Sequence, residues 1–137
     1  MHIEGLRSPY DQVSGLVFFG RMLDKIRLHA AGRLPADYNR GGGMDARICT
    51  FLKLDYDRIV AIASSESEDA RVLERCYDEG RHPSEEEILI FNAFMTKRGW
   101  RDEQSEDIRQ RKINLGLGHR DDLQTCFDIH DADEGRK

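Results

Sequence analysis

Residues 16–30 read LVFFGRMLDKIRLHA, and this stretch decides the fold class of the chain. Its main apolar side chains recur at alternating steps of three and four, which places them on one face of an α-helix: Leu16, Phe19, Leu23, Ile26 and Ala30. Further apolar residues lie outside that face, so the helix is apolar most of the way round. Since such a helix packs against neighbours on several sides, we expect a central helix here that ends at Gly32.

The start of this helix is signalled upstream. Ser8 followed by Pro9 is typical of an N-cap and a first helical position, and Asp11 places a carboxylate where the helix dipole favours it. Gly15 and Gly20 weaken the pattern. We therefore expect the helix to begin at Ser8, or further along the chain.

Capping signals divide the rest of the chain into further helices. Ser84, three residues before Glu87, predicts a capping box, and Gly99 predicts the end of that helix. Its expected core face consists of Ile88, Phe91, Phe94 and Met95. The other expected helices start near Asp45, Asp55, Ser67, Ser105 and Asp121.

No sustained alternation of apolar and polar residues predicts a sheet. With 137 residues, the chain has the length of one domain with one core. The expected fold is therefore all-α: a compact single-domain bundle, residues 1–137, of about six to seven helices around a central N-terminal helix.

Composition limits the classes of function. The chain has 21 basic and 26 acidic residues, and its net charge of -5 does not favour nucleic acid or an anionic membrane as a partner. No run approaches the roughly twenty apolar residues of a membrane span. Three cysteines without a CxxC pair fit neither a disulfide framework nor a zinc site. We expect reduced thiols, a cytoplasmic protein and no cofactor.

Four charged residues of the central helix form the strongest candidate site: Arg21, Asp24, Lys25 and Arg27. Asp24 lies three residues from both Arg21 and Arg27, so it can accept a hydrogen bond from either across one turn. On so apolar a helix these charges should be partly desolvated. The cluster is then either a structural tie or a cationic site for a small anionic ligand, with Asp24 orienting the cations or acting as a base.

Other patterns do not predict a site. Gly41–Gly43 lacks the Lys and Ser or Thr that follow a phosphate loop, and Asp45 would place a carboxylate where the phosphate should bind, so a flexible loop is favoured. The acidic residues from Asp128 to Glu134 lack the spacing of a calcium loop and favour a solvated tail. No histidine spacing indicates a metal site, and no catalytic set is recognised.

Several runs resemble a bacterial family catalogued as domain of unknown function 5069: Leu6–Pro9, Arg21–Lys25 (RMLDK), Arg120–Asp122 and Phe127–Asp128. The resemblance covers nearly the whole chain, and RMLDK is its most specific piece. The chain departs from it at the triple glycine and at Cys126, where an aromatic residue is usual. The resemblance implies one domain without an assigned activity, and it implies that Arg21, Asp24 and Lys25 belong to the common design.

Two functions follow as hypotheses. The favoured one is a small non-enzymatic helical module that acts through a protein partner or self-association, marked by one exposed patch of aromatic residues such as Phe18, Phe19, Tyr38 or Trp100. The alternative is a protein that binds a small anionic ligand, or an uncharacterised enzyme, with its site around Arg21, Asp24 and Lys25.

Nucleic-acid binding is a third and weaker hypothesis. Arg109, Arg111 and Lys112 form a local basic run in a helical region. However, Glu106 and Asp107 precede that run by one turn, and this spacing favours pairs within the helix over contacts to phosphates.

Overall fold

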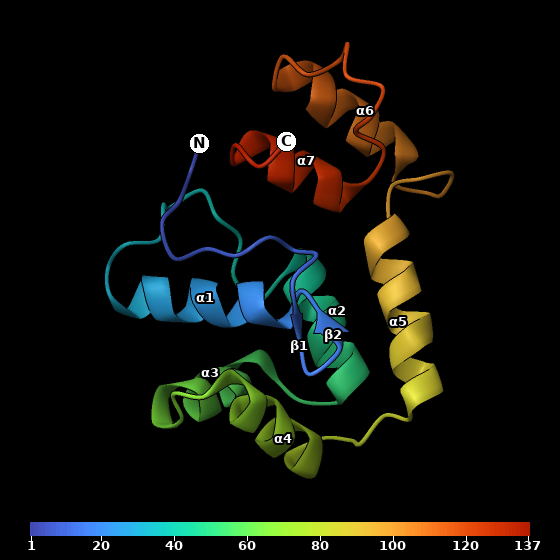
Figure 1. Cartoon of the computed structure of the whole chain (residues 1–137). Coiled ribbons are helices and arrows are strands. Elements are labelled where there is room, and N and C mark those ends of the chain that lie inside the picture. Colours follow the sequence, from blue (N-terminus) through green and yellow to red (C-terminus); the bar gives the residue numbers. More distant parts are fainter.

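The structure is a computed structural model that describes all 137 residues, with seven helices and one two-stranded hairpin (Figure 1). The helices are α1 (Phe19–Ala30), α2 (Gly43–Leu52), α3 (Tyr56–Ser65), α4 (Asp69–Glu79), α5 (Glu85–Lys97), α6 (Ser105–Asn114) and α7 (Cys126–Asp133). The strands are β1 (Gln12–Val13) and β2 (Leu16–Val17). The all-α class and the number of helices are confirmed. None of the helices combines the length and the apolar character that crossing a membrane requires.

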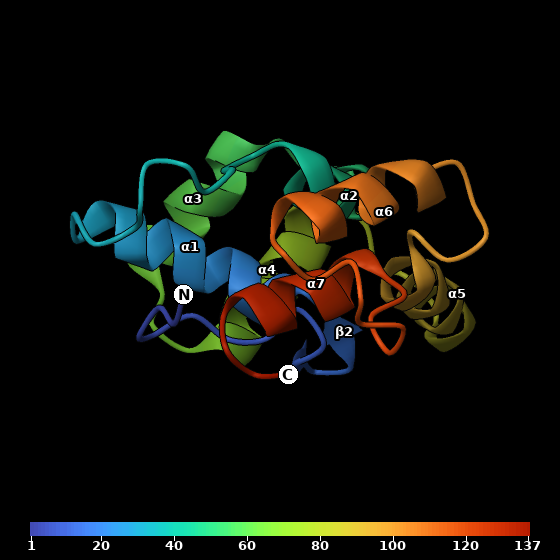
Figure 2. The same cartoon turned by 90° about the horizontal axis from the view of Figure 1, so that it is seen from above.

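Helix α1 lies between two layers of helices (Figure 1), on the side of the molecule opposite α5 (Figure 2). Helices α3 and α4 pack on one side of it, while α7, with α6 beyond it, lies on the other. Helix α5 stands at one end of the molecule, where it contacts β2 and α7. Eight of the twelve residues of α1 are buried, which confirms the expectation of a central helix.

The main core is one cluster of 18 buried residues, drawn from the hairpin and from every helix except α6. Leu16, Phe19, Met22 and Leu23 are fully buried in it, and each such side chain contributes roughly 1.5–3 kcal/mol through burial. Helix α6 instead packs on α7 through a separate cluster of three residues: Ile108, Cys126 and Ile129. Helix α6 therefore lies outside the main core.

The predicted helix start at Ser8 is wrong and the later start is confirmed, because a hairpin occupies residues 12–17 and α1 begins at Phe19. Leu16, which was expected on the face of this helix, lies in β2. Ser14 and Gly15 both have positive φ, 47° and 88°, as the two central residues of a type I′ turn require. Asn92 of α5 fixes the hairpin by donating to the Gly15 carbonyl at 2.7 Å and accepting from the Val17 amide at 3.1 Å. The Ser8 hydroxyl instead accepts from the Tyr10 amide in a local turn and donates to the Asp131 carboxylate of α7 at 2.9 Å.

The signals around α5 are confirmed at both ends but not along its whole face. Ser84 and Glu87 form the capping box, and Gly99 has a φ of 101°. Met95 is fully buried, as expected, whereas Phe94 is 42% exposed, so its placement in the core is wrong. Two guanidinium groups lie near the Phe94 ring: the centres of Arg47 of α2 and of Arg98, the C-cap of α5, are 5.1 and 5.5 Å from its centroid.

The expected exposed aromatic patch is also wrong at its two central residues. Phe18 and Phe19 are 2% and 0% exposed. Phe18 stacks on Phe127 of α7 with ring centroids 5.7 Å apart, so both rings belong to the core between α1 and α7. Trp100 is exposed and lies beside Arg101.

Gly99 should tolerate no side chain, because a Cβ there would lie 2.5 Å from Ile108 Cγ1 and 3.3 Å from the Cys126 amide nitrogen. The replacement Gly99→Ala should lower the free energy of unfolding by about 2–4 kcal/mol in urea denaturation, from left-handed strain plus overpacking. Gly116→Ala is the matched control, since its φ is 74° but nothing lies within 4 Å of a Cβ. Strain alone should lower its stability by about 1 kcal/mol, and equal losses in the two variants would contradict the packing argument.

Candidate functional site

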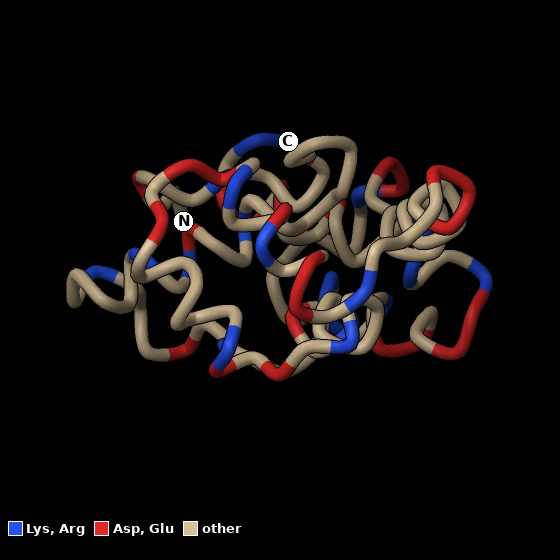
Figure 3. The backbone as a smooth tube through the Cα atoms, turned by 90° about the horizontal axis from the view of Figure 1, so that it is seen from below, with Lys and Arg blue, Asp and Glu red and all other residues tan.

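A pocket of about 490 Å³ opens between α1, α2, α6 and α7 and the end of α5. Small-molecule sites typically have volumes of roughly 300–1,000 Å³. Basic side chains outnumber acidic ones on its walls: Arg21, Lys25, Arg47, Arg98 and Arg111 against Asp37, Asp133 and Glu134. Along the rest of the chain both signs are scattered (Figure 3). This basic pocket, defined by those residues, thus concentrates positive charge in a protein whose net charge is -5.

The floor of the basic pocket contains a buried ion pair between α1 and the residue after α7. The two terminal nitrogens of the Arg21 guanidinium, Nη1 and Nη2, donate to Glu134, each at 2.7 Å, and both side chains are 2% exposed. Tyr38 and Arg136 donate to the same carboxylate. Burial alone would raise the pKa of Glu134, but these donors and the Arg21 charge lower it to about 2. Arg21 is therefore a structural tie, and its charge is neutralised at the floor.

Lys25 is the second basic group at the floor. Its ammonium lies 2.9 Å from the Asp45 carboxylate, which is fully buried, and donates to the Asn39 carbonyl. Burial lowers the pKa of Lys25, and the Asp45 charge opposes that shift. Asp45 also accepts from the Gly41 amide, so this pair holds the triple-glycine loop against α1.

The other two residues of the predicted cluster point elsewhere. Asp24 accepts from the side chain and backbone amide of Arg7, with oxygen to nitrogen distances of 2.9–3.0 Å, and not from Arg21 or Arg27. Arg27 pairs with Asp69 at 2.5 Å, and Arg7 pairs with the same carboxylate at 2.7 Å. The predicted hydrogen bonds of Asp24 are therefore wrong, and neither Asp24 nor Arg27 lines the basic pocket.

Three arginines at the edge of the basic pocket, Arg47, Arg98 and Arg111, have weak partners or none; we call them the rim arginines. Arg47 forms no ion pair or hydrogen bond, and the only hydrogen bond of the Arg111 side chain goes to the Cys126 sulfur. Arg98 is 8% exposed and lies 3.4 Å from the Asp102 carboxylate without a hydrogen bond. Their charges are thus neutralised far less than those of the floor.

The beginning of α2 also faces the basic pocket. Gly42 is the N-cap of α2 and provides no side-chain cap, and the amides of Gly43 and Met44 donate to no group in the protein. Both residues line the pocket. Asp45 was expected to place a carboxylate here, but its side chain turns inward to Lys25. The helix start therefore presents free amides and a partial positive charge.

A thiol and an imidazole from α7 complete the wall. Cys126 Sγ lies 3.6 Å from His130 Nε2 and 3.7 Å from Arg111 Nη1. Burial and the neighbouring charges of Arg21 and Arg111 lower the pKa of His130 to about 3, so its ring is neutral at pH 7. No three His, Cys, Asp or Glu side chains come together as a metal site would require.

Sequence reasoning identified two of the basic residues of the pocket, Arg21 and Lys25, and missed the rim arginines, Cys126 and His130. These residues come from four separate segments, so no spacing along the chain connects them. The one available signal was their placement next to glycines or helix ends, as for Arg98 beside Gly99.

Replacing Glu134 by Gln should lower the free energy of unfolding at pH 7 by roughly 3 kcal/mol, because it leaves Arg21 buried without a counter-charge. The folded pKa of Glu134, about 2, lies below its ordinary value of 4.5, so the stabilisation is present above pH 4.5 and is lost as the pH falls towards 2. Urea denaturation at several pH values should show the two proteins converging over that window. Glu106→Gln, at an exposed pair, should match the wild type throughout, and a constant difference between Glu134→Gln and wild type from pH 7 to 2 would refute the assignment.

Comparison with known proteins gives a family but no activity. No curated protein matches the chain. A family model described as domain of unknown function, DUF5069, matches residues 3–136. This match confirms the resemblance drawn from the sequence and spans nearly the whole chain. The chain therefore belongs to the DUF5069 family.

Proposed function

We propose that the protein binds a small anionic molecule in the basic pocket, through a phosphate or similarly charged group. The observation that carries the proposal is the convergence of the three rim arginines on one pocket, where Arg47 and Arg111 pair with no carboxylate and Arg98 has only the 3.4 Å contact with Asp102. They come from α2, from the residue after α5 and from α6. Guanidinium groups bind phosphates and carboxylates through paired, charge-assisted hydrogen bonds.

Electrostatics supports a ligand more strongly than a purely structural role. Like charges held close together destabilise the folded state unless opposite charges neutralise them. The chain has 26 acidic and 21 basic residues, so carboxylates to pair with these arginines are available in number. The floor shows the structural alternative, since Arg21 and Lys25 each have a buried carboxylate partner. Arg47 and Arg98 instead lie against the Phe94 ring, and the side chain of Arg111 donates only to the Cys126 sulfur, so donors of these arginines remain for an anion. The free amides of Gly43 and Met44 add further donors suited to a phosphate.

A second candidate is the interaction module, which acts through a protein partner or a second copy of the chain. Its support is the outer face of α5, where Leu89 and Ile90 are 68% and 63% exposed and Phe94 lies one turn further along. Single exposed apolar residues are common on monomers, so this face is weaker support than the pocket. Sedimentation over a range of concentrations, with Leu89→Glu as the variant, tests it directly.

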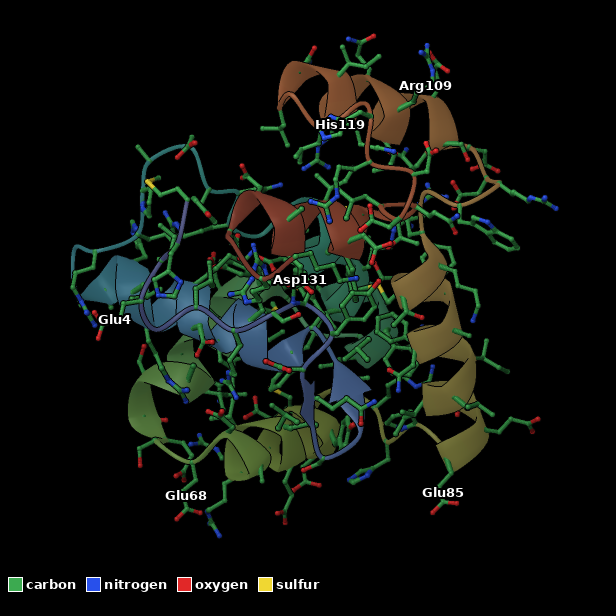
Figure 4. All side chains as sticks on the ribbon, turned by 45° about the horizontal axis from the view of Figure 1, so that its top comes forward. Glu4, Glu68, Glu85, Arg109, His119 and Asp131 are labelled. Atoms are coloured by element: carbon green, nitrogen blue, oxygen red, sulfur yellow. The ribbon has the colours of Figure 1, made fainter.

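Binding of pyrophosphate and of citrate, measured by isothermal titration calorimetry, tests the pocket and separates phosphates from carboxylates. A charge-assisted hydrogen bond contributes roughly 1.5–3 kcal/mol, so Arg47→Gln and Arg111→Gln should each weaken binding by about tenfold or more. The matched control is Arg109→Gln, which removes the same charge from α6. Arg109 pairs with Glu106 and extends from the outer side of that helix (Figure 4).

The Arg109→Gln variant should bind like the wild type. Equal weakening in Arg109→Gln and Arg111→Gln would show attraction by overall charge rather than a site. No binding of either anion to the wild type at millimolar concentration would refute the proposed function.

A further inference from the structure

The three cysteines have different environments, and only Cys126 lines the basic pocket. Burial raises the pKa of Cys76 to about 12, and burial together with the nearby carboxylates of Asp45 and Asp55 raises that of Cys49 to about 11. Both are therefore protonated and weak nucleophiles at pH 7. Cys126 is buried as well, but its polar partners are a guanidinium group and an imidazole rather than carboxylates.

Cys126 has two polar partners that act on its sulfur from the same side of the basic pocket. It is the first residue of α7, after the N-cap Thr125, and His130 follows one turn later on the same face. The sulfur lies 3.6 Å from His130 Nε2, and Arg111 of α6 donates to it at 3.7 Å. A thiol, a base and a cation thus meet at one point of the pocket wall.

Two neighbours bear on the reactivity of the thiol. The thiolate is the nucleophilic species, and a guanidinium group and the start of a helix both stabilise a thiolate. The His130 ring, which is neutral at pH 7, lies within hydrogen-bond reach of the sulfur and orients it. We infer that Cys126 is a nucleophilic thiol that attacks an electrophilic anion held in the basic pocket, with His130 orienting the sulfur and Arg111 stabilising its charge.

The substrate class is an anion whose electrophilic carbon carries a leaving group. The sulfur forms a bond to that carbon while the bond to the leaving group breaks, and the leaving group departs with the bonding pair. The proton of the thiol passes to water. This inference rests on the proposed function.

Alkylation by iodoacetate and iodoacetamide tests the inference, because the two reagents form the same type of thioether and differ in charge. Rates at each cysteine are measured at pH 7 by mass spectrometry of peptides, with glutathione in the same buffer as the free thiol. Cys126 should react before Cys49 and Cys76. Its ratio of iodoacetate rate to iodoacetamide rate should exceed that of glutathione by about tenfold, the effect of one charge-assisted contact. A ratio equal to that of glutathione, or a Cys126 no faster than Cys49, would overturn the inference.

Two variants test the assigned roles. Arg111→Gln should abolish the preference for iodoacetate, while Arg109→Gln should keep it. His130→Gln should slow the alkylation of Cys126 at pH 7 severalfold with an unchanged circular dichroism spectrum, because the sulfur loses the neighbour that orients it. A rate equal to that of the wild type would remove His130 from the mechanism and overturn that part of the inference.

Failure of this inference is distinguishable from failure of the proposed function. Cys126→Ser should bind pyrophosphate or citrate like the wild type, because the thiol is not a ligand for the anion. If the wild type binds the anion but Cys126 is unreactive, the inference fails and the pocket stands. If neither protein binds an anion and Cys126 shows no preference for iodoacetate, both fail.

Discussion

Arg21 and Glu134 form a two-pronged ion pair where the first helix meets the residue that follows the last, 113 positions apart in sequence. Removing each charge from water costs several kcal/mol, so such a pair is stable only when its remaining donors and acceptors are also satisfied. Here Tyr38 and Arg136 donate further hydrogen bonds to the Glu134 carboxylate, and the Arg7 carbonyl accepts one from the Arg21 guanidinium. The pair is therefore hard to rearrange. Because it fixes α7 on α1, it also fixes where the side chains of α7 stand in the pocket.

The pocket uses the same residue types in two opposite ways. At the floor, Arg21 and Lys25 are paired with buried carboxylates, and they join α1 to α7 and to the start of α2. At the rim, the arginines have weak partners or none, and one of them lies on α6, which packs through a cluster of only three residues. A rigid floor and a weakly packed rim suit a binding site, since an anion that joins the rim arginines also stabilises α6 against local opening.

The sequence predicted those parts of the fold that depend on neighbours along the chain. The period of α1, the capping box at Ser84 and the glycine at the end of α5 are all local signals, and all are present. The hairpin was missed, although Ser14-Gly15 is a turn signal, because two-residue strands leave no alternation to detect. The candidate site was half predicted. Helical spacing brings Arg21 and Lys25 to one face. Asp24 pairs with Arg7 and Arg27 pairs with Asp69, and no spacing along the chain predicts these two pairs.

Phe18 shows how the core and the pocket constrain each other. It precedes α1 with a φ of 70°, a left-handed conformation that costs a residue with a Cβ roughly 1–2 kcal/mol. Its ring is buried against Phe127, and burial of a phenyl ring contributes roughly 1.5–3 kcal/mol, enough to offset that strain. The same ring lines the pocket, where the Lys25 ammonium lies 5.3 Å from its centroid. The strained turn therefore gives the Phe18 ring two roles. The ring packs in the core, and its cation–π contact with Lys25 offsets part of the hydration that the ammonium loses on burial.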